Sequence, residues 1–210
     1  MNYEPKQIMN ILILGGSGFV GRAICSKLVV AGHSITVPTR KRDNARALFP
    51  LPSVTVVEAD VYDAVALTQL ACGKDAVINL VGILNGNFER AHVTLTENAI
   101  AACKSAGVSR YVHMSALGAS ENGPSAYQKS KAKADALVRA SGLDFTIFAP
   151  SVIFGRGDSF LTKFASMVGF LPPLMPMMLP GAGARRRRVL STCRPSAQPA
   201  RSVDRTSIHR

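Results

Sequence analysis

Two side chains in the second half of the chain have the types and the spacing that proton transfer requires. Tyr127 and Lys131 stand four residues apart, so on a helix they share one face. A lysine ammonium beside a phenol favours the phenolate, which lowers the tyrosine pKa from about 10 toward neutral pH. Such a tyrosine can exchange a proton with a substrate carbonyl or alcohol while a cofactor exchanges a hydride. Ser115, at the end of the preceding predicted strand, can donate a hydrogen bond to the same oxygen.

A glycine-rich loop near the N-terminus predicts where that cofactor binds. The loop follows a short apolar run and leads directly into a helical pattern. Glycine permits a tight turn and lets the backbone approach a pyrophosphate, and the N–H groups at the start of the helix bind the anion. A glycine-rich turn without a ligand is the alternative. We expect a dinucleotide to contact the whole loop, which consists of Gly15, Gly16, Ser17, Gly18, Phe19, Val20 and Gly21.

The end of the second predicted strand bears on which dinucleotide is bound. NAD-binding proteins usually place an acidic residue there for the ribose diol, whereas an arginine accommodates a 2′-phosphate. Here the strand runs into Arg40, Lys41 and Arg42, and the first acid is Asp43. This pattern predicts NADP as the cofactor, with Arg40 as the first candidate for the phosphate and Arg42 as the second. NAD remains the alternative cofactor. A further alternative is that the basic residues form a solvated surface loop that binds no phosphate.

These candidates need a scaffold, and the order of apolar runs indicates one. Short apolar runs alternate with longer amphipathic ones, which is typical of an α/β fold with a doubly wound, mostly parallel sheet, the Rossmann type. Apolar residues on both faces of the runs indicate a sheet covered by helices on both sides. The segment 39–52 is expected to be helical in part. The predicted strands are 10–14, 34–38, 54–58, 76–81, 110–115 and 145–149, and the predicted helices are 19–31, 64–71, 91–105 and 125–141.

The net charge of the 210-residue chain, +12, is concentrated at its C-terminal end. Residues 185–210 carry eight arginines, no lysine and one acid, so this segment alone holds a charge of +7. We expect it to be disordered or non-native sequence, for example from a frameshift. A basic arm for nucleic acid or acidic lipid is the alternative. Because the rest of the chain has an ordinary charge, nucleic-acid binding is not the expected function.

Cysteine usage and hydropathy narrow the class of protein further. The four cysteines are far apart in the sequence and have no histidine at metal-ligand spacing, so we expect neither a disulfide framework nor a metal site. No apolar core of a secretory signal and no uninterrupted membrane-spanning stretch is visible. We therefore expect a soluble, cytoplasmic protein.

From about Met9 to Gly183 the sequence resembles the short-chain dehydrogenase/reductase superfamily, in its extended and atypical branches. Within it, the chain is similar to bacterial relatives of the nucleotide-binding accessory subunit of respiratory complex I and to NAD-dependent epimerases and dehydratases. The motifs that carry the resemblance are the glycine loop 15–21, Asp60-Val61, Asn79-Leu80-Val81-Gly82, Ser115, Tyr127, Lys131 and the segment that begins at Pro150.

The resemblance implies roles for these residues. Asp60 and Val61 are expected along the adenine, Val81 and Gly82 along the backbone of the cofactor, and Lys131 and Pro150 also at the cofactor. Ser115, Tyr127 and Lys131 are implied as the catalytic residues. The resemblance also implies peripheral association with a membrane or with respiratory components.

Two positions depart from the family pattern. His92 stands where extended members usually have an active-site asparagine, and Ala149 stands before Pro150 where relatives commonly have arginine. His92 is either a proton relay or a polar residue on a helix face. Two functions therefore stay open: an oxidoreductase or epimerase-like enzyme with an unidentified small-molecule substrate, or a dinucleotide-binding protein without turnover.

The expected domain organisation follows from the same comparison. We expect residues 1–160 to form the NAD(P)-binding domain and residues 161–184 to begin a substrate-side segment. The Arg-rich tail, 185–210, follows directly, so we expect the substrate-side part of the fold to be incomplete.

Overall fold

The fold is known from a computed structural model, which describes residues 7–151 and 153. Six strands form one sheet: β1 (Asn10–Leu14), β2 (Ser34–Thr39), β3 (Val54–Glu58), β4 (Ala76–Asn79), β5 (Arg110–Met114) and β6 (Asp144–Phe148). Every pair of neighbouring strands is parallel, and the order is β3-β2-β1-β4-β5-β6. This is the expected Rossmann-type sheet, in which the strand order reverses between β1 and β4.

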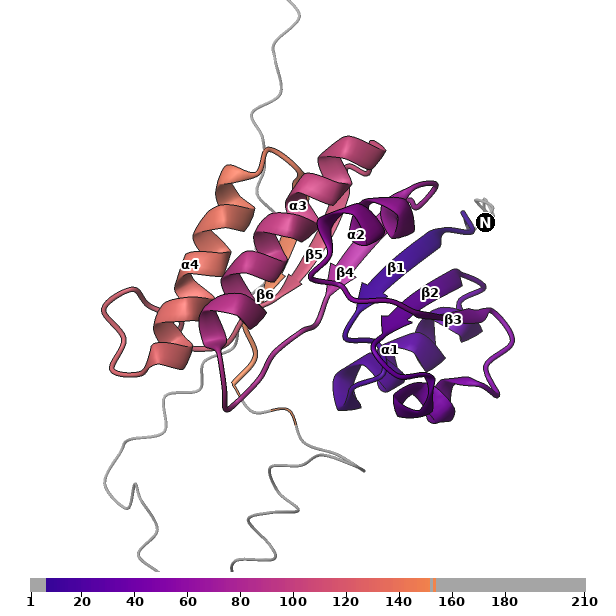
Figure 1. Cartoon of the computed structure of the whole chain (residues 1–210), viewed down its shortest axis with the longest axis horizontal. Helices are drawn as coiled ribbons and strands as arrows, with labels where there is room; N and C mark the ends of the chain where they lie inside the picture. The colour runs from indigo at the N-terminus through magenta and orange to yellow at the C-terminus, as the bar shows by residue number, and fades with distance from the viewer. Residues whose placement is uncertain (1–6, 152, 154–210) are drawn as a thin grey trace, which may run out of the picture. The chain divides into compact units, whose positions relative to one another are not determined.

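Helical segments connect the strands. They are α1 (Phe19–Val30), α2 (Ala64–Ala71), α3 (Leu95–Ala106) and α4 (Ala126–Ala140), together with the 3₁₀ segment η1 (Arg42–Leu48) and the π-helical segment η2 (Glu89–Thr94). Figure 1 shows α2, α3 and α4 along one side of the sheet and α1 on the other. The layered arrangement confirms the α/β class that the alternating pattern predicts.

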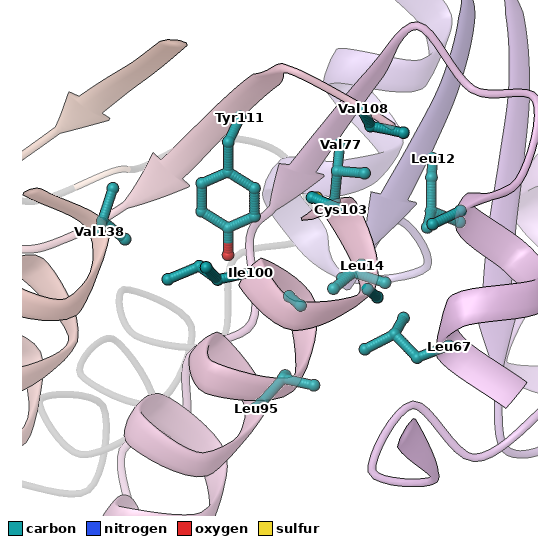
Figure 2. Packing of buried hydrophobic residues seen from close by; sticks show 13 residues of the cluster. Leu12, Leu14, Leu67, Val77, Leu95, Ile100, Cys103, Val108, Tyr111 and Val138 are labelled. Carbon is teal, nitrogen blue, oxygen red and sulfur yellow. The ribbon is translucent and has the colours of Figure 1, made fainter. Parts of the chain in front are cut away.

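Two apolar clusters join the layers, one on each face of the sheet. On the face of α2, α3 and α4, Leu12, Leu14 and Val77 pack with helical residues, and Tyr111 extends from β5 toward Ile100 of α3 (Figure 2). On the other face, Ile11, Ile13, Ile35 and Val37 pack against α1 and η1 through Cys25, Ala45 and Leu48. Successive residues of β1 thus enter opposite clusters, as the twofold alternation of a strand requires.

The strand ends differ from the prediction for a reason that involves one side chain. β4 stops at Asn79 instead of residue 81, because the Asn79 amide oxygen accepts a hydrogen bond from the Val81 N–H, at 3.1 Å, and turns the chain. The Asn79 amide nitrogen donates to Thr96 Oγ1 and to the Tyr111 hydroxyl. The buried Asn79 amide therefore bonds to α3 and to β5 and ends strand β4, although the apolar run in the sequence continues to residue 81.

Other predicted boundaries shift by a few residues. β5 ends at Met114 instead of residue 115, β6 covers 144–148 instead of 145–149, and the predicted helix 91–105 starts earlier, as η2. The outer strands β3 and β6 are only partly buried, contrary to the expectation of strands apolar on both covered faces. The substrate-side segment 161–184 and the tail 185–210 lie outside the described residues.

Candidate functional site

A cleft of about 700 Å³ lies at the carboxyl ends of the strands, beside the reversal of strand order. Ligands of doubly wound sheets bind at this place because the loops from neighbouring strands diverge there. The ends of four strands and the segments that follow them line it. These residues are Gly15, Ser17 and Gly18 after β1; Thr39, the last residue of β2, with Arg40 and Asn44 after it; Asp60, Val61 and Tyr62 after β3; and Val81, Gly82 and Ile83, with Asn87 and Arg90, after β4.

The glycine loop is a cradle that larger residues would fill. Gly15 has a φ of +79°, a conformation that favours glycine. A Cβ on Gly16 would lie 2.7 Å from Val37 Cγ2, and one on Gly21 would lie 2.5 Å from Gly16 Cα. The loop therefore packs closely against the Val37 side chain of β2, and the first turn of α1 packs against the backbone of the loop. This close packing is what the glycine pattern predicts.

The helix that follows the loop leaves its first turn open to an anion. Gly18 is the N-cap of α1, no side chain caps the helix, and its first turn holds no acid. Uncapped N–H groups and the positive end of the helix dipole favour a phosphate. The open cradle and the uncapped helix together fit the pyrophosphate of a dinucleotide.

The predicted cofactor residues divide into those that line the cleft and those that do not. Gly15, Ser17, Gly18, Arg40, Asp60, Val61, Val81 and Gly82 line it, whereas Gly16, Phe19, Val20, Gly21, Arg42, Lys131 and Pro150 are not among its lining residues. The guanidinium of Arg42 lies 5.6 Å from the centre of the Phe49 ring. The Pro150 carbonyl accepts a hydrogen bond from the Leu117 N–H at 2.7 Å. The structure thus separates the two arginine candidates.

Tyr127 and Lys131 both lie on α4, whose start is well defined. Ser125 is the N-cap, and its hydroxyl oxygen accepts a hydrogen bond from the Gln128 N–H. Lys131 is buried, and its ammonium donates to the carbonyl oxygens of Met114, at 2.8 Å, and Val81, at 3.3 Å. The lysine therefore bridges the carboxyl end of β5 and the turn after β4.

The ionisation of the pair departs from the prediction. Burial raises the pKa of Tyr127, opposite to the expected direction, and burial lowers the pKa of Lys131 to about 8. The Lys131 ammonium is bonded to two backbone carbonyls in this structure, and desolvation of the phenol is the dominant effect on Tyr127. At neutral pH the tyrosine carries its proton and is able to act as an acid.

Ser115 follows β5 directly, and its side chain turns toward α4. Its hydroxyl donates a 2.7 Å hydrogen bond to Asp135 Oδ2, and the residue is buried. It is not among the residues that line the cleft. A serine hydroxyl has one proton, so while it is bonded to Asp135 it cannot donate to a substrate oxygen. Its catalytic role stays a prediction.

His92 belongs to the buried core of the site and not to an exposed helix face. Its Nε2 accepts a hydrogen bond from the Ile83 N–H at 3.2 Å, which assigns the proton to Nδ1. Nδ1 lies 2.9 Å from Ser130 Oγ, and Ser130 donates in turn to the Tyr127 carbonyl. Burial lowers the His92 pKa to about 4, so the ring is neutral. With both nitrogens engaged, His92 ties the loop after β4 to α4 and has no free position for a relay.

Several residues of the site were missed by sequence reasoning. Asp135 is buried beside Ser115, and its spacing of four residues from Lys131 was a readable signal. Arg90 and Tyr62 line the cleft together, with the guanidinium 4.4 Å from the ring centre. No sequence motif marks that contact, because the two residues come from different connections.

Within residues 7–151 and 153, no group of three or more histidine, cysteine or acidic side chains is placed to hold a metal ion. In the same part of the chain, no helix has the length and hydropathy to cross a membrane.

Comparison with solved structures supports the fold. The chain superimposes on a Bacillus thuringiensis protein described as Pen with a TM-score of 0.67 and 19% identity, covering 79% of this chain and 58% of that one. It also matches the Bordetella bronchiseptica enzyme WbmH in complex with NAD⁺, with a TM-score of 0.64, 20% identity, and coverage of 78% and 63%.

Curated relatives fall into two groups. The mouse protein "NADH dehydrogenase [ubiquinone] 1 alpha subcomplex subunit 9, mitochondrial" is 33% identical over 167 residues, which cover 76% of this chain and 44% of that protein. A Stenotrophomonas maltophilia 2-alkyl-3-oxoalkanoate reductase is 30% identical over 177 residues, covering 71% and 52%. The match therefore spans about half of each relative or less.

The family model described as NAD(P)H-binding matches residues 15–159, which include the cleft and the Tyr127–Lys131 helix. Together with the parallel sheet, the glycine cradle and the two groups of relatives, this confirms the short-chain dehydrogenase/reductase resemblance. The chain belongs to the NAD(P)H-binding family of Rossmann-fold proteins and is homologous to subunit 9 of the mitochondrial NADH dehydrogenase 1 alpha subcomplex, a complex I subunit.

Proposed function

We propose that the protein binds NADP(H) in the cleft and that residues 1–160 act as its NADP(H)-dependent reductase domain. The observation that supports this most strongly is that Gly82, a residue of the cleft wall, lies close to Lys131 of α4. Gly82 lines the cleft, and a Cβ built on it would lie 3.7 Å from the buried Lys131 ammonium. The predicted proton-transfer helix therefore stands directly behind a wall of the cofactor cleft.

The cofactor preference rests on the loop after β2. Arg40 is exposed and lines the cleft beside Thr39 and Asn44, with no acid from that loop among the lining residues. A guanidinium binds a 2′-phosphate through charge-assisted hydrogen bonds, whereas the ribose diol of NAD is usually met by a carboxylate. These contacts favour NADP over NAD.

A nicotinamide held in the cleft would supply a hydride, and in the proposed reaction Tyr127 supplies the proton. The Tyr127 phenol transfers its proton to the oxygen of a substrate carbonyl, which becomes an alcohol as its carbon accepts the hydride. The raised pKa of Tyr127 fits the role of an acid in the reductive direction. Two relatives are named as reductases, of a 2-alkyl-3-oxoalkanoate and of ceramide.

Fluorescence titration with NADPH and NADH tests the cofactor assignment. We expect tighter binding of NADPH, and about a tenfold or greater loss of NADPH affinity in Arg40→Ala with little change for NADH. Arg42→Ala is the matched control, because its guanidinium lies over Phe49. Equal losses in the two variants would contradict the role of Arg40.

A screen of carbonyl substrates with NADPH, followed by Tyr127→Phe, tests the chemistry. We expect the variant to retain cofactor affinity and to lose at least about 100-fold in kcat. An unchanged kcat in the variant would remove Tyr127 from the mechanism.

A nucleotide-binding subunit without turnover is the second candidate. The engaged Ser115 hydroxyl favours it, and so does the homology to mitochondrial complex I subunits. In this case the protein is expected in the cytoplasm, peripheral to the inner membrane and associated with respiratory components. Co-purification with complex I from solubilised membranes, together with NADPH binding and no turnover, would favour this candidate over the first.

A further inference from the structure

The buried part of the described structure contains two side chains that are ordinarily charged at neutral pH, and both lie on α4. Lys131 is 2% exposed and Asp135 is 6% exposed. They stand four residues apart, so they share one face of the helix. Taking an ammonium out of water is costly unless an opposite charge or hydrogen bonds compensate. The charge of Lys131 therefore depends on what surrounds it.

The groups around Lys131 come from three neighbouring elements and from its own helix. Val81, after β4, and Met114 of β5 offer carbonyl oxygens. His92 of η2 and His113 of β5 are neutral, because burial and the nearby lysine lower their pKa values to about 4 and about 3. Among the described residues, Asp135 is the acid whose charge acts on Lys131, and it opposes the effect of burial on the lysine pKa.

Ser115 holds Asp135 in place. Its hydroxyl donates to Oδ2 at 2.7 Å, and no other hydrogen bond to this carboxylate is present in the described residues. The other carboxylate oxygen, Oδ1, lies 3.6 Å from His113 Nε2, too far for a hydrogen bond. The exposed Arg139 approaches Oδ2 only to 4.0 Å. Burial raises the pKa of Asp135, and the Ser115 hydrogen bond is the largest of the contacts that oppose this effect. The position of the carboxylate therefore depends mainly on Ser115, and Ser115 also favours its charged form.

We propose that Asp135 is a positioning residue that keeps the buried Lys131 in its ammonium form, and that Ser115 acts by fixing the Asp135 carboxylate. The relation of this pair to catalysis rests on the proposed function, whereas the ionisation of Lys131 does not. An ammonium has three N–H donors, and the two backbone carbonyls use two of them. The third is retained only while the lysine is protonated, and the nitrogen that carries it lies close to Gly82, which lines the cleft.

The direct test is a pH titration of Lys131 observed by NMR. The lysines are labelled with ¹³C at Cε, and the Lys131 signal is assigned by its loss in Lys131→Arg. In Asp135→Asn we expect the midpoint to fall by about one pH unit relative to the unchanged chain. Ser115→Ala should shift it in the same direction by less. Lys133→Gln is the control and should leave the midpoint in place, because Lys133 is an exposed residue of the same helix whose ammonium pairs with Glu89.

A second measurement connects the titration to binding. At pH 9 we expect Asp135→Asn to bind NADPH about tenfold more weakly than the unchanged chain, with equal affinities at pH 6. If the unchanged chain binds no NADPH, the proposed function fails, and the NMR titration still decides the role of Asp135. Equal Lys131 midpoints in the unchanged chain and Asp135→Asn would overturn the proposal. If Asp135→Asn does not fold, an unshifted midpoint in Ser115→Ala would overturn it as well.

Discussion

Gly21, in the first turn of α1, packs directly on the backbone of Gly15, so that a Cβ at Gly21 would overlap the Gly15 carbonyl oxygen. The atoms that it would meet are all backbone, and they include Gly16 Cα at 2.5 Å. No side-chain rotation relieves such an overlap. The close approach of helix and loop therefore requires a residue without a side chain at position 21.

Gly21→Ala is expected to destabilise the protein and to abolish nucleotide binding. The methyl group forces α1 away from the loop, at a cost of about 1–3 kcal/mol in unfolding free energy. Chemical denaturation and NADPH titration measure the two effects. Gly82→Ala is the control for stability, since its Cβ would meet Lys131 Nζ at an ordinary 3.7 Å. Equal stabilities of Gly21→Ala and the unchanged chain would contradict the expectation.

Gly16→Ala should be relieved by a second substitution. Here the added Cβ would meet a side chain, Val37, at 2.7 Å from Cγ2 and 2.9 Å from Cγ1. Val37→Ala removes both methyl groups at the cost of a cavity. We expect the double variant to be more stable than the sum of the single changes by about 1 kcal/mol or more. If the losses of unfolding free energy in the two single variants simply added in the double variant, the clash between the new Cβ and Val37 would not be the cause of the destabilisation.

The stability of the protein should fall on mild acidification because of two buried histidines. The pKa values of His92 and His113 are lowered to about 4 and about 3, mainly by burial. Between these values and the unfolded pKa of about 6.5, the unfolded chain binds protons that the folded protein does not. Stability is therefore fully present above pH 6.5 and is lost as the pH falls.

Each histidine should account for a loss on the order of 2 kcal/mol between pH 7 and pH 5. Urea unfolding at several pH values measures it. His113→Phe, which keeps a buried ring, should reduce the pH dependence by about the share of one residue. The same slope in this variant and in the unchanged chain would show that His113 is not responsible.

Two helix caps with similar contacts should have different local effects. Ser125 caps α4 two residues before Tyr127, and Asp63 caps α2 by accepting from the N–H groups of Val65 and Ala66. Each substitution by alanine should cost about 1 kcal/mol in unfolding free energy. Only Ser125→Ala should speed hydrogen exchange in the first turn of α4. If the first turn of α4 were equally protected from hydrogen exchange in Ser125→Ala and in Asp63→Ala, the local role of Ser125 would be contradicted.

The scaffold was predictable because its signals are local. The apolar run at β1, the glycines after it and the amphipathic pattern of α1 each follow from neighbouring residues, and the structure agrees with them. The end of β4 was not predictable, because it depends on Asn79 meeting Thr96 and Tyr111 from distant parts of the sequence. Long-range hydrogen bonds of this kind leave no periodic pattern.

The candidate site shows the same division. The shared face of Tyr127 and Lys131 follows from their spacing on one helix, whereas their ionisation follows from burial, which the sequence does not display. The partner of Ser115 lies 20 residues away, on a helix that reads as ordinary amphipathic sequence. The sequence placed Arg40 before Arg42 as the candidate for the phosphate, and in the structure Arg40 lines the cleft whereas the Arg42 guanidinium lies over Phe49.

The Asn79 side chain has a consequence for experiments that score every substitution in turn. Its amide gives both donors and its acceptor to three partners, so aspartate would lose the donors, leucine would lose all three contacts, and glutamine would be too long. Asn79 is itself absent from the lining of the cleft. A mutational map would mark Asn79 among the positions least tolerant of substitution. From that map alone, a residue that stabilises the fold would be mistaken for one that contacts the ligand.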